Sequence, residues 1–337
     1  MGAEIRTNTA LGRDVTIDGL FEDGYSAVYL ALGAHKGMEL GVPGEKASGV
    51  RQGVDFLREV NLSGSSRVGR KVAVVGGGNV AVDVARSALR MGAEEVTIVY
   101  RRTRNEMPAL REEIEAAECE GIRIAYLCTP QEILDRDGEV SGIRLIEMEL
   151  GEADSSGRRR PVPVPGSEFE LEVDQVFPAI GQRPDISPIE DEEGMEFTRW
   201  ATTEVDSITY ETGRPGVFAG GDLQTGPWVA IGAVAQGREA AESILRSIDG
   251  RDMSQGREPL EQPSEEADYR PIPEDEPVRR RVDMPELPLE ERTCTFKEVE
   301  LGLTDESGRN EADRCLNCGY CCECFECVNA CGPQAVT

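Results

Sequence analysis

Short apolar runs alternate with segments of helical period through the first 250 residues. A strand is predicted at Ala3–Asn8, followed by a short helix and a buried strand at Tyr25–Leu32. A further apolar strand begins at Arg70 and runs through a glycine turn into a helix and another strand. Strands that alternate with helices in this way are typical of α/β folds with parallel sheets.

The same alternation continues toward the C-terminus. The pattern predicts a helix at Ala109–Glu120, strands at Ile122–Leu127, Asp174–Ile180 and Val217–Ala219, a hairpin within Glu132–Leu150 that turns at Asp137–Gly138, and a helix from about Val229 to Ser247. Residues 251–300 hold seven prolines and many charges, which is typical of an extended linker. A short amphipathic helix is expected between this linker and a cysteine-rich end.

One glycine turn carries a chemical signal. Gly76, Gly78 and Ala81 form G-x-G-x-x-A at the end of an apolar strand and the start of a helix. In that context the glycines let the backbone approach a pyrophosphate, and the helix N-terminus supplies N–H groups and positive partial charge. We expect Asn79 to cap this helix and the loop to bind a dinucleotide, the alternative being a structural turn.

Three arginines follow the next strand, and they bear on which nucleotide binds. An NAD site usually places an acid at this strand end for the ribose 2′-hydroxyl. This chain has Arg101, Arg102 and Arg104 there instead. Guanidinium groups suit a 2′-phosphate, so NADPH is expected over NADH, the alternative being a solvated arginine run.

A second glycine-containing strand end lies at Gly221 and Asp222. By itself the aspartate could only cap the next turn. Together with the first loop, however, it resembles the flavin-contacting motif of two-dinucleotide-binding-domain flavoproteins. The resemblance implies that Asp222 binds the FAD ribitol and that the helix start at Val229, Ala230 and Ile231 faces the pyrimidine end of the isoalloxazine.

Four stretches make the resemblance more specific. VAVVGGGNVAVDVARSALRMGAEEVTIVYRRTRNEMPAL, AIGQRPD (with Gly181), GVFAGGD and ALGA (with Ala31 and Gly33) resemble the small chain of NADPH-dependent glutamate synthase and its relatives. The similarity covers nearly all of residues 1–250. It implies a Rossmann-like α/β flavoprotein with parallel sheets that binds FAD and NADPH, with Ala31, Gly33 and Gly181 among the cofactor contacts.

The resemblance also implies a domain order. Residues 1–60 and 176–250 would form parts of the FAD domain and residues 61–175 the NADPH domain, followed by the linker 251–300 and an iron–sulfur segment 301–337. The family's FAD domain should begin with its own G-x-G-x-x-G, which this sequence lacks. Either the sequence is a fragment of a longer protein, or another chain supplies the N-terminal half of the FAD domain.

Cysteines are concentrated at the C-terminal end. Four of them follow C-x2-C-x2-C-x3-C, the spacing of bacterial ferredoxin ligands. Zinc needs two pairs separated by a longer loop, and disulfides suit a secreted chain, so a [4Fe–4S] cluster is preferred over both. The predicted ligands are Cys315, Cys318, Cys321, Cys324, Cys327 and Cys331. A second cluster stays open: Cys315, Cys318 and Cys322 could form part of it, completed by Cys294, by a partner or by sequence beyond Thr337. Cys119 and Cys128 are expected to be ordinary buried thiols.

Net charge narrows the function further. With 36 Lys and Arg against 64 Asp and Glu, the chain carries −28, which argues against nucleic acid and anionic membrane partners. No 18-residue apolar run or basic leader is present, so we expect no membrane insertion and a cytoplasmic location. We therefore expect an iron–sulfur flavoprotein that passes electrons between NADPH, FAD and [4Fe–4S] clusters to a partner subunit or ferredoxin. The alternatives are the electron-input subunit of a heterodisulfide-reductase-like complex and a non-catalytic docking module.

Overall fold

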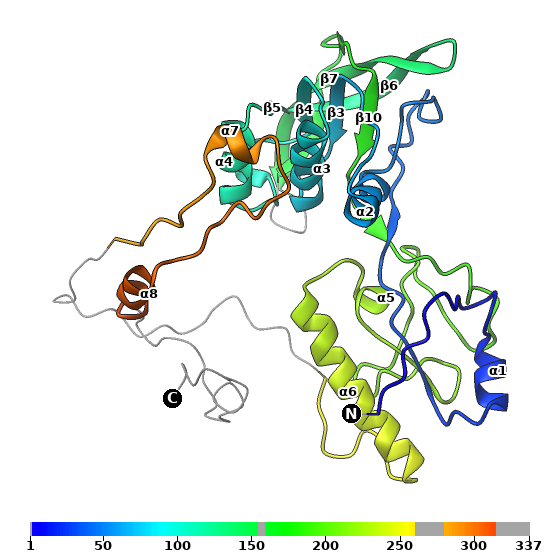
Figure 1. Cartoon of the computed structure of the whole chain (residues 1–337). Helices are drawn as coiled ribbons and strands as arrows, with labels where there is room; N and C mark the ends of the chain where they lie inside the picture. Colours follow the sequence, from blue (N-terminus) through cyan, green and yellow to red (C-terminus); the bar gives the residue numbers. More distant parts are fainter. Residues whose placement is uncertain (1, 154–158, 260–279, 315–337) are drawn as a thin grey trace. The chain divides into compact units, whose positions relative to one another are not determined.

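The computed structural model describes residues 2–153, 159–259 and 280–314 (Figure 1). It divides into two compact units: residues 1–261 with 293–295, and residues 262–292 with 296–337. Among the described residues, no helix is both long and apolar enough to cross a lipid bilayer.

A four-stranded parallel sheet forms the centre of the first unit. Its order is β10 (Gln175–Pro178), β3 (Lys71–Val75), β4 (Glu95–Tyr100) and β5 (Arg123–Tyr126). Successive side chains of a strand point to opposite faces, and all the β3 positions after Lys71 are buried. A parallel sheet covered on both faces reads as such a continuous apolar run.

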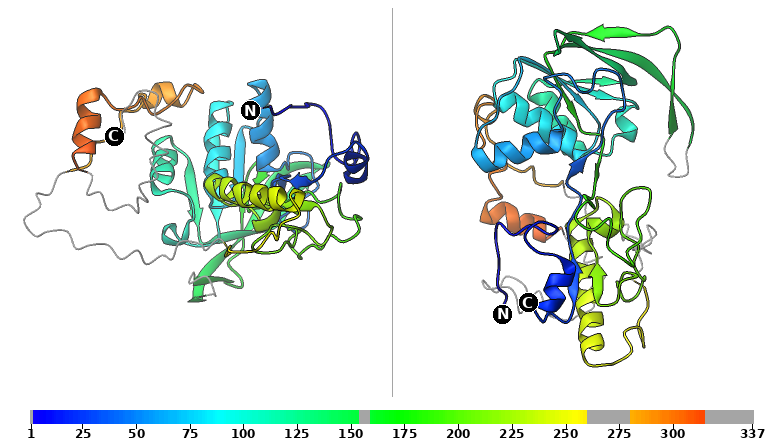
Figure 2. Two further views of the ribbon diagram at one scale, coloured as in Figure 1. Left: turned by 90° about the horizontal axis from the view of Figure 1, so that it is seen from below. Right: turned by 90° about the vertical axis from the view of Figure 1, so that its right-hand side faces the viewer.

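Two cores cover the two faces of this sheet. Val72 and Val74 of β3 pack with the helices α2 (Gly53–Ser63), α3 (Asn79–Arg90) and α4 (Arg111–Cys119). Ala73 and Val75 pack instead with an antiparallel sheet. Figures 1 and 2 show α2 and α3 on one side of β3 and β4, and the antiparallel strands on the other.

The antiparallel sheet is a long hairpin with additions. Strand β6 (Cys128–Arg136) pairs with β7 (Glu139–Ala153) across the expected turn at Asp137–Gly138. Strands β8 (Arg159–Pro163) and β9 (Phe169–Leu171) also pair with β7.

The rest of the first unit contains the strand ends predicted to bind flavin, and its sheet is smaller than the four-stranded one. Parallel strands β1 (Val28–Leu30) and β12 (Val217–Ala219) pair residue for residue, Val28 with Val217 and Leu30 with Ala219. They share a core with α1 (Ile17–Glu22) and the short α5 (Asp222–Thr225), and α6 (Ala230–Ile248) follows. An antiparallel ribbon joins β2 (Lys36–Gly37) to β11 (Gln182–Arg183). It lies where the chain passes to and from the four-stranded parallel sheet.

Most predicted elements are confirmed within a few residues, but the first strand is wrong. Residues Ala3–Asn8 form no strand in the structure, and all of them are exposed. A strand needs a hydrogen-bonded neighbour, and none of the pairings among the described strands involves this segment. In the second unit, α7 (Leu289–Arg292) lies inside the predicted linker, and α8 (Asp305–Ala312) matches the expected short helix.

Candidate functional site

The glycine loop between β3 and α3 is built so that backbone, not side chains, lines it. A Cβ on Gly76, which has φ +149°, would lie 2.2 Å from the Ala179 carbonyl oxygen. A Cβ on Gly77 would lie 2.4 Å from the Tyr100 ring. A Cβ on Gly78 would meet nothing within 4 Å among the described residues. The first two glycines are therefore required by packing, whereas Gly78 leaves room for a ligand to approach the backbone.

The start of α3 is left without a side-chain cap. Its N-cap residue is Gly78, and among the described residues no side chain accepts a hydrogen bond there as a cap. Thr16 and Thr304 cap α1 and α8 through their hydroxyl oxygens, whereas α2, α4 and α6 start without a side-chain cap, as α3 does. Exposed N–H groups and the helix dipole at such an end favour a phosphate.

The predicted cap by Asn79 is wrong. Asn79 is the first residue of α3, and its Oδ1 accepts a hydrogen bond from Leu110 N at 2.9 Å. The side chain thus holds the segment that follows β4 instead of the helix end. Asn79 still lies on the loop, so its predicted contact with the cofactor stays a prediction.

The segment after β4 closes against the glycine loop. Ala109 N donates to Gly77 O at 3.1 Å, and the Tyr100 hydroxyl donates to Glu106 O at 2.6 Å. Glu106 forms a capping box with Thr103 across a short 3-10 turn. The sequence prediction did not include Gly77 or Tyr100, although the run of three glycines after an apolar strand was the available signal.

The three predicted arginines have different environments. Arg101 is exposed directly after β4. Arg102 is buried, and its Nε donates to Arg159 O at 2.8 Å. Arg104 forms an ion pair with Glu118 at 2.5 Å, which raises the pKa of the guanidinium. Arg101 is therefore the most exposed of the three, and its contact with a 2′-phosphate stays a prediction.

On the flavin side, the predicted residues follow two adjacent strands. Ala31 and Gly33 come after β1, and Gly221 and Asp222 come after β12. Because the strands are parallel and paired in register, all four lie at the same edge of this small sheet. In open α/β sheets, ligands bind outside the carboxyl ends of the strands.

A buried glutamine fixes the conformation of the second turn. The Gln236 Oε1 accepts from Gly221 N at 2.6 Å, and its Nε2 donates to Gln224 Oε1 at 2.9 Å. Gly221 has φ +65°, and a Cβ on Gly220 would lie 2.2 Å from the Tyr29 hydroxyl oxygen. Gln236 lies on α6, fifteen residues along the chain, so its role could be found only from the folded structure.

The Asp222 carboxylate already has one partner. Its Oδ1 accepts from Trp228 N at 3.1 Å, as a local cap would. The Trp228 ring lies over Gly232, where a Cβ would lie 2.1 Å from a ring carbon. The predicted contacts at the start of α6, Val229, Ala230 and Ile231, are all exposed. The turn after β12 is therefore held by the Asp222–Trp228 hydrogen bond, and the apolar residues at the start of α6 beside it are exposed.

Gly181 directly precedes β11 of the β2–β11 ribbon. It has φ +137°, and its carbonyl accepts from Met38 N at 3.0 Å. Its role in cofactor binding stays a prediction.

The cysteines divide between described and undescribed residues. The six predicted cluster ligands, and Cys322, lie outside the described residues. Cys128 is buried, as expected, and burial raises the pKa of its thiol to about 11. The expectation for Cys119 is wrong, because this thiol, in the last turn of α4, is exposed.

Several known proteins are similar to this chain in sequence. The chain is 45% identical over 325 residues to the NADP(+)-dependent formate dehydrogenase subunit beta of Moorella thermoacetica, covering 94% of this chain and 46% of that protein. It is 38% identical over 356 residues to the NADPH-Fe(3+) oxidoreductase subunit beta of Geobacter sulfurreducens, with coverages of 94% and 52%. The small chain of Escherichia coli glutamate synthase [NADPH] is 35% identical over 272 residues, with coverages of 74% and 56%. The chain thus spans about half the length of these relatives.

Among solved structures, Mycobacterium tuberculosis FprA in complex with NADPH superposes with a TM-score of 0.59 at 22% identity, covering 72% of this chain and 68% of that one. This likeness concerns the fold alone. Residues 5–237 match the family model for pyridine nucleotide-disulphide oxidoreductases, and the two glycine-containing strand ends both lie within that match. The chain therefore belongs to the pyridine nucleotide-disulphide oxidoreductase family.

Proposed function

We propose that this chain is the electron-transfer subunit of an NADPH-linked oxidoreductase, which takes a hydride equivalent from NADPH and delivers electrons to a partner subunit or ferredoxin. The observation that carries the proposal is the loop at Gly76–Gly78, open at Gly78 and followed by a helix start without a side-chain cap. When bound, FAD and an iron–sulfur cluster would supply the conversion between paired and single electrons.

The nucleotide half has a defined role for each residue. The backbone of Gly76–Gly78 and the first turn of α3 would hold the pyrophosphate of NADPH. Arg101 would pair with the 2′-phosphate, and Asn79 would keep the segment from Thr103 to Leu110 closed over the loop through its bond to Leu110 N. These residues bind and orient the nucleotide.

The flavin half fits its cofactor in part. Gly33 has φ +70° and nothing within 4 Å of a built Cβ among the described residues, so a ligand can approach its backbone. Gly221 and Asp222 would contact the ribitol, and the exposed start of α6 would face the isoalloxazine. The described residues include no second glycine loop of the G-x-G-x-x-G type. We infer that FAD binding also needs such a strand and loop, carried by the same polypeptide or by a partner chain.

The relatives favour an electron-transfer subunit over a glutamate synthase small chain. The two relatives named as beta subunits match 94% of this chain, whereas the glutamate synthase small chain matches 74%. The cysteine spacing from Cys321 to Cys331 supports a [4Fe–4S] cluster as the exit for electrons. The cytoplasm remains the proposed compartment, because clustered thiols are kept reduced there.

Anaerobic purification with its native partner tests the proposal. We expect flavin bands that NADPH bleaches, and roughly 4 iron atoms for each chain from one cluster. Glutamate formation from glutamine and 2-oxoglutarate would instead identify a glutamate synthase. A complex with no flavin and no spectral response to NADPH would leave only the docking module.

A further inference from the structure

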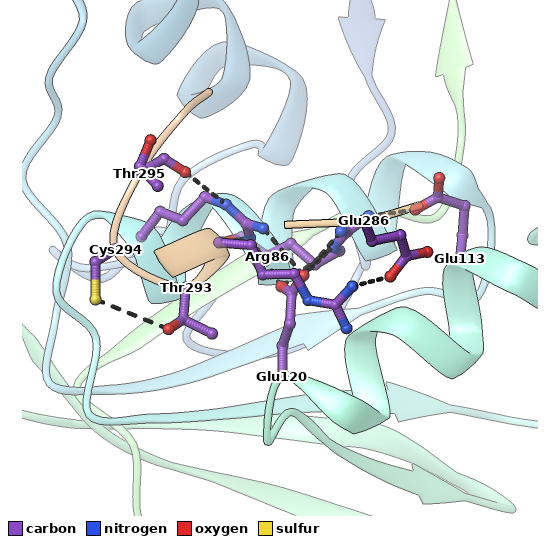
Figure 3. Close-up of polar contacts among 9 residues, drawn as sticks. Arg86, Glu113, Glu120, Glu286, Thr293, Cys294 and Thr295 are labelled. Atoms are coloured by element: carbon purple, nitrogen blue, oxygen red, sulfur yellow. Dashed lines mark hydrogen bonds and ion pairs between the residues drawn. The ribbon is translucent and has the colours of Figure 1, made fainter. Parts of the chain in front are cut away.

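A buried group of charges joins the ends of α3 and α4. Arg86 and Arg90 lie on α3, one turn apart, and Glu120 is the C-cap residue of α4. Arg86 Nη2 donates to Glu120 Oε1 at 2.8 Å, and Arg90 Nη1 donates to Glu120 Oε2 at 2.8 Å. Arg86 also forms an ion pair with Glu113. Figure 3 shows Arg86 between Glu113 and Glu120, with Thr295 nearby.

This group is deeply desolvated. The Glu120 side chain is 0% exposed and that of Arg90 is 6% exposed. Burial raises the pKa of the Glu120 carboxyl, but the hydrogen bonds from Arg86 and Arg90 outweigh it, so the net shift is downward. Burying an ion pair often gains little stability over an apolar packing, so its presence calls for a reason beyond local stability.

Arg90 has a third contact, which Arg86 lacks. While Nη1 and Nη2 of Arg90 bind Glu120, its Nε donates to the carbonyl oxygen of Thr295 at 3.2 Å. The Glu120 carboxylate and the Arg86 carbonyl oxygen, which accepts from Arg90 Nη1 at 2.9 Å, hold the Arg90 guanidinium in place, so that its Nε faces the Thr295 backbone. A lysine has no donor equivalent to Nε in that position.

The segment that Arg90 contacts has an unusual place in the chain. Residues 293–295 belong to the first compact unit, although the residues on both sides of them belong to the second. The segment comes after the proline-rich stretch and before the first clustered cysteine, Cys315. Residues 293–295 are therefore the last part of the chain that belongs to the first unit.

We propose that Arg90, held by Glu120 and by the Arg86 carbonyl oxygen, anchors residues 293–295 to the nucleotide-binding domain and so fixes where the chain leaves that domain on its way to Cys315. Arg90 is a positioning residue, not a contact of any cofactor. Its use in electron transfer rests on the proposed function, because the segment that it holds leads along the chain to the clustered cysteines. The anchor itself does not depend on that function.

The competing explanation is that the charges only stabilise the α3–α4 packing. The two arginines separate these explanations, since both bind Glu120 but only Arg90 contacts Thr295. Arg90→Lys keeps a positive charge beside Glu120 and loses the Nε donor. Arg86→Lys disturbs the same carboxylate and leaves the Arg90–Thr295 hydrogen bond in place, so it is the matched control.

Limited trypsin digestion of the full chain provides the readout. The Arg292 side chain is buried, so cleavage of the Arg292–Thr293 bond requires the chain to open locally at the start of the segment. We expect Arg90→Lys to raise the cleavage rate at this bond roughly tenfold, because the variant loses one charge-assisted hydrogen bond to the segment. Arg86→Lys should leave the rate at the wild-type value, even if it lowers the melting temperature by as much or more. Hydrogen exchange of the peptide 293–297 should follow the same order.

The proposal is overturned if Arg90→Lys leaves cleavage and exchange unchanged, or if Arg86→Lys accelerates both equally. NADPH binding is measured on the same variants and should not change. Loss of the anchor effect with normal NADPH binding would remove this inference alone. A wild-type chain that does not bind NADPH would remove the proposed function and leave the anchor standing.

Discussion

At the scale of single residues, the three consecutive glycines 76–78 have different reasons to be glycine. Packing against Ala179 and Tyr100 explains the first two, whereas no clash accounts for the third, whose backbone is left open. The sequence motif assigned Gly76 and Gly78 alike to phosphate binding. The structure separates the stability of the loop from its use.

Gly78→Ala is accordingly expected to fold normally and to bind NADPH at least roughly tenfold more weakly, because the added methyl lies where the pyrophosphate would approach. Gly76→Ala, the comparison variant, should lose roughly 2 kcal/mol or more of folding free energy, because its Cβ clashes with the Ala179 carbonyl and its φ suits only glycine. Thermal unfolding and fluorescence titration with NADPH measure the two effects. Wild-type affinity in Gly78→Ala would contradict the assigned loop.

The arginines after β4 also differ in a way that the sequence alone cannot show. We expect Arg101→Gln to weaken NADPH binding roughly tenfold and to leave NADH binding unchanged, because one charge-assisted contact to the 2′-phosphate is lost. Arg104→Gln serves as the control, since Arg104 is already paired with Glu118. Titrations with both nucleotides give the ratio. An equal loss for NADPH and NADH would exclude a 2′-phosphate contact at Arg101.

At the scale of elements, local patterns predicted the β3–loop–α3–β4 unit well, because each piece has its own apolar period. Helix α2 and strands β8 and β9 were missed. Strands β8 and β9 are largely exposed, so no apolar alternation marks them, and they form because β7 offers a partner. Asn79 was placed at a helix start correctly, but its hydrogen bond to Leu110 depends on how the segment after β4 folds back.

The β2–β11 ribbon carries an ion pair whose pH dependence can be measured. Lys36 Nζ contacts Asp185 Oδ1 at 2.7 Å, and this hydrogen bond, with help from Ser187, lowers the pKa of Asp185 from 3.8 to about 2. A carboxyl with a lowered folded-state pKa stabilises the fold above its unfolded value near 3.8. That stabilisation is lost as the pH falls toward about 2.

Lys36→Met should therefore destabilise the fold by roughly 1 kcal/mol at pH 7, after allowance for solvent screening of a half-exposed pair. The difference from wild type should shrink between pH 4 and pH 2. Lys71→Met, which removes the more exposed pair with Glu172, should cost less. Urea unfolding at several pH values tests this. A difference that stays constant down to pH 2 would show that Asp185 is not the titrating partner.

At the scale of the whole molecule, the sequence allowed the fold class to be predicted, because it follows from alternating strands and helices and from motifs at strand ends, whereas the order of the cofactor sites stays a prediction. The division of the chain into units could not be predicted in the same way. Residues 293–295 read as part of a linker, yet they belong to the first unit, and the Arg90–Thr295 hydrogen bond is one contact that ties them to it. Long-range contacts of this kind leave no local pattern in the sequence.

The nucleotide site and the cysteine segment are built from different parts of the chain. We therefore expect removal of iron by a chelator to leave the NADPH dissociation constant within roughly twofold of its original value, since the predicted cluster ligands and the glycine loop share no residues and independent sites behave additively. Electron delivery to an external acceptor should be lost in the same sample. Fluorescence titration before and after chelation, with iron analysis, provides the measurement. A large loss of NADPH affinity on iron removal would show that the two sites are coupled.

The pairing of Val28 with Val217 has a consequence for how the chain folds. In the sequence, the whole four-stranded parallel sheet lies between these two strands. Most of its strands and helices are close neighbours in sequence. Contacts between residues close in sequence form faster than contacts between residues far apart in sequence. The four-stranded sheet should therefore form before β1 pairs with β12. During synthesis, β1 leaves the ribosome long before its partner exists. The flavin-side edge is therefore the last part of the first unit to be assembled, and it is the part most in need of a chaperone.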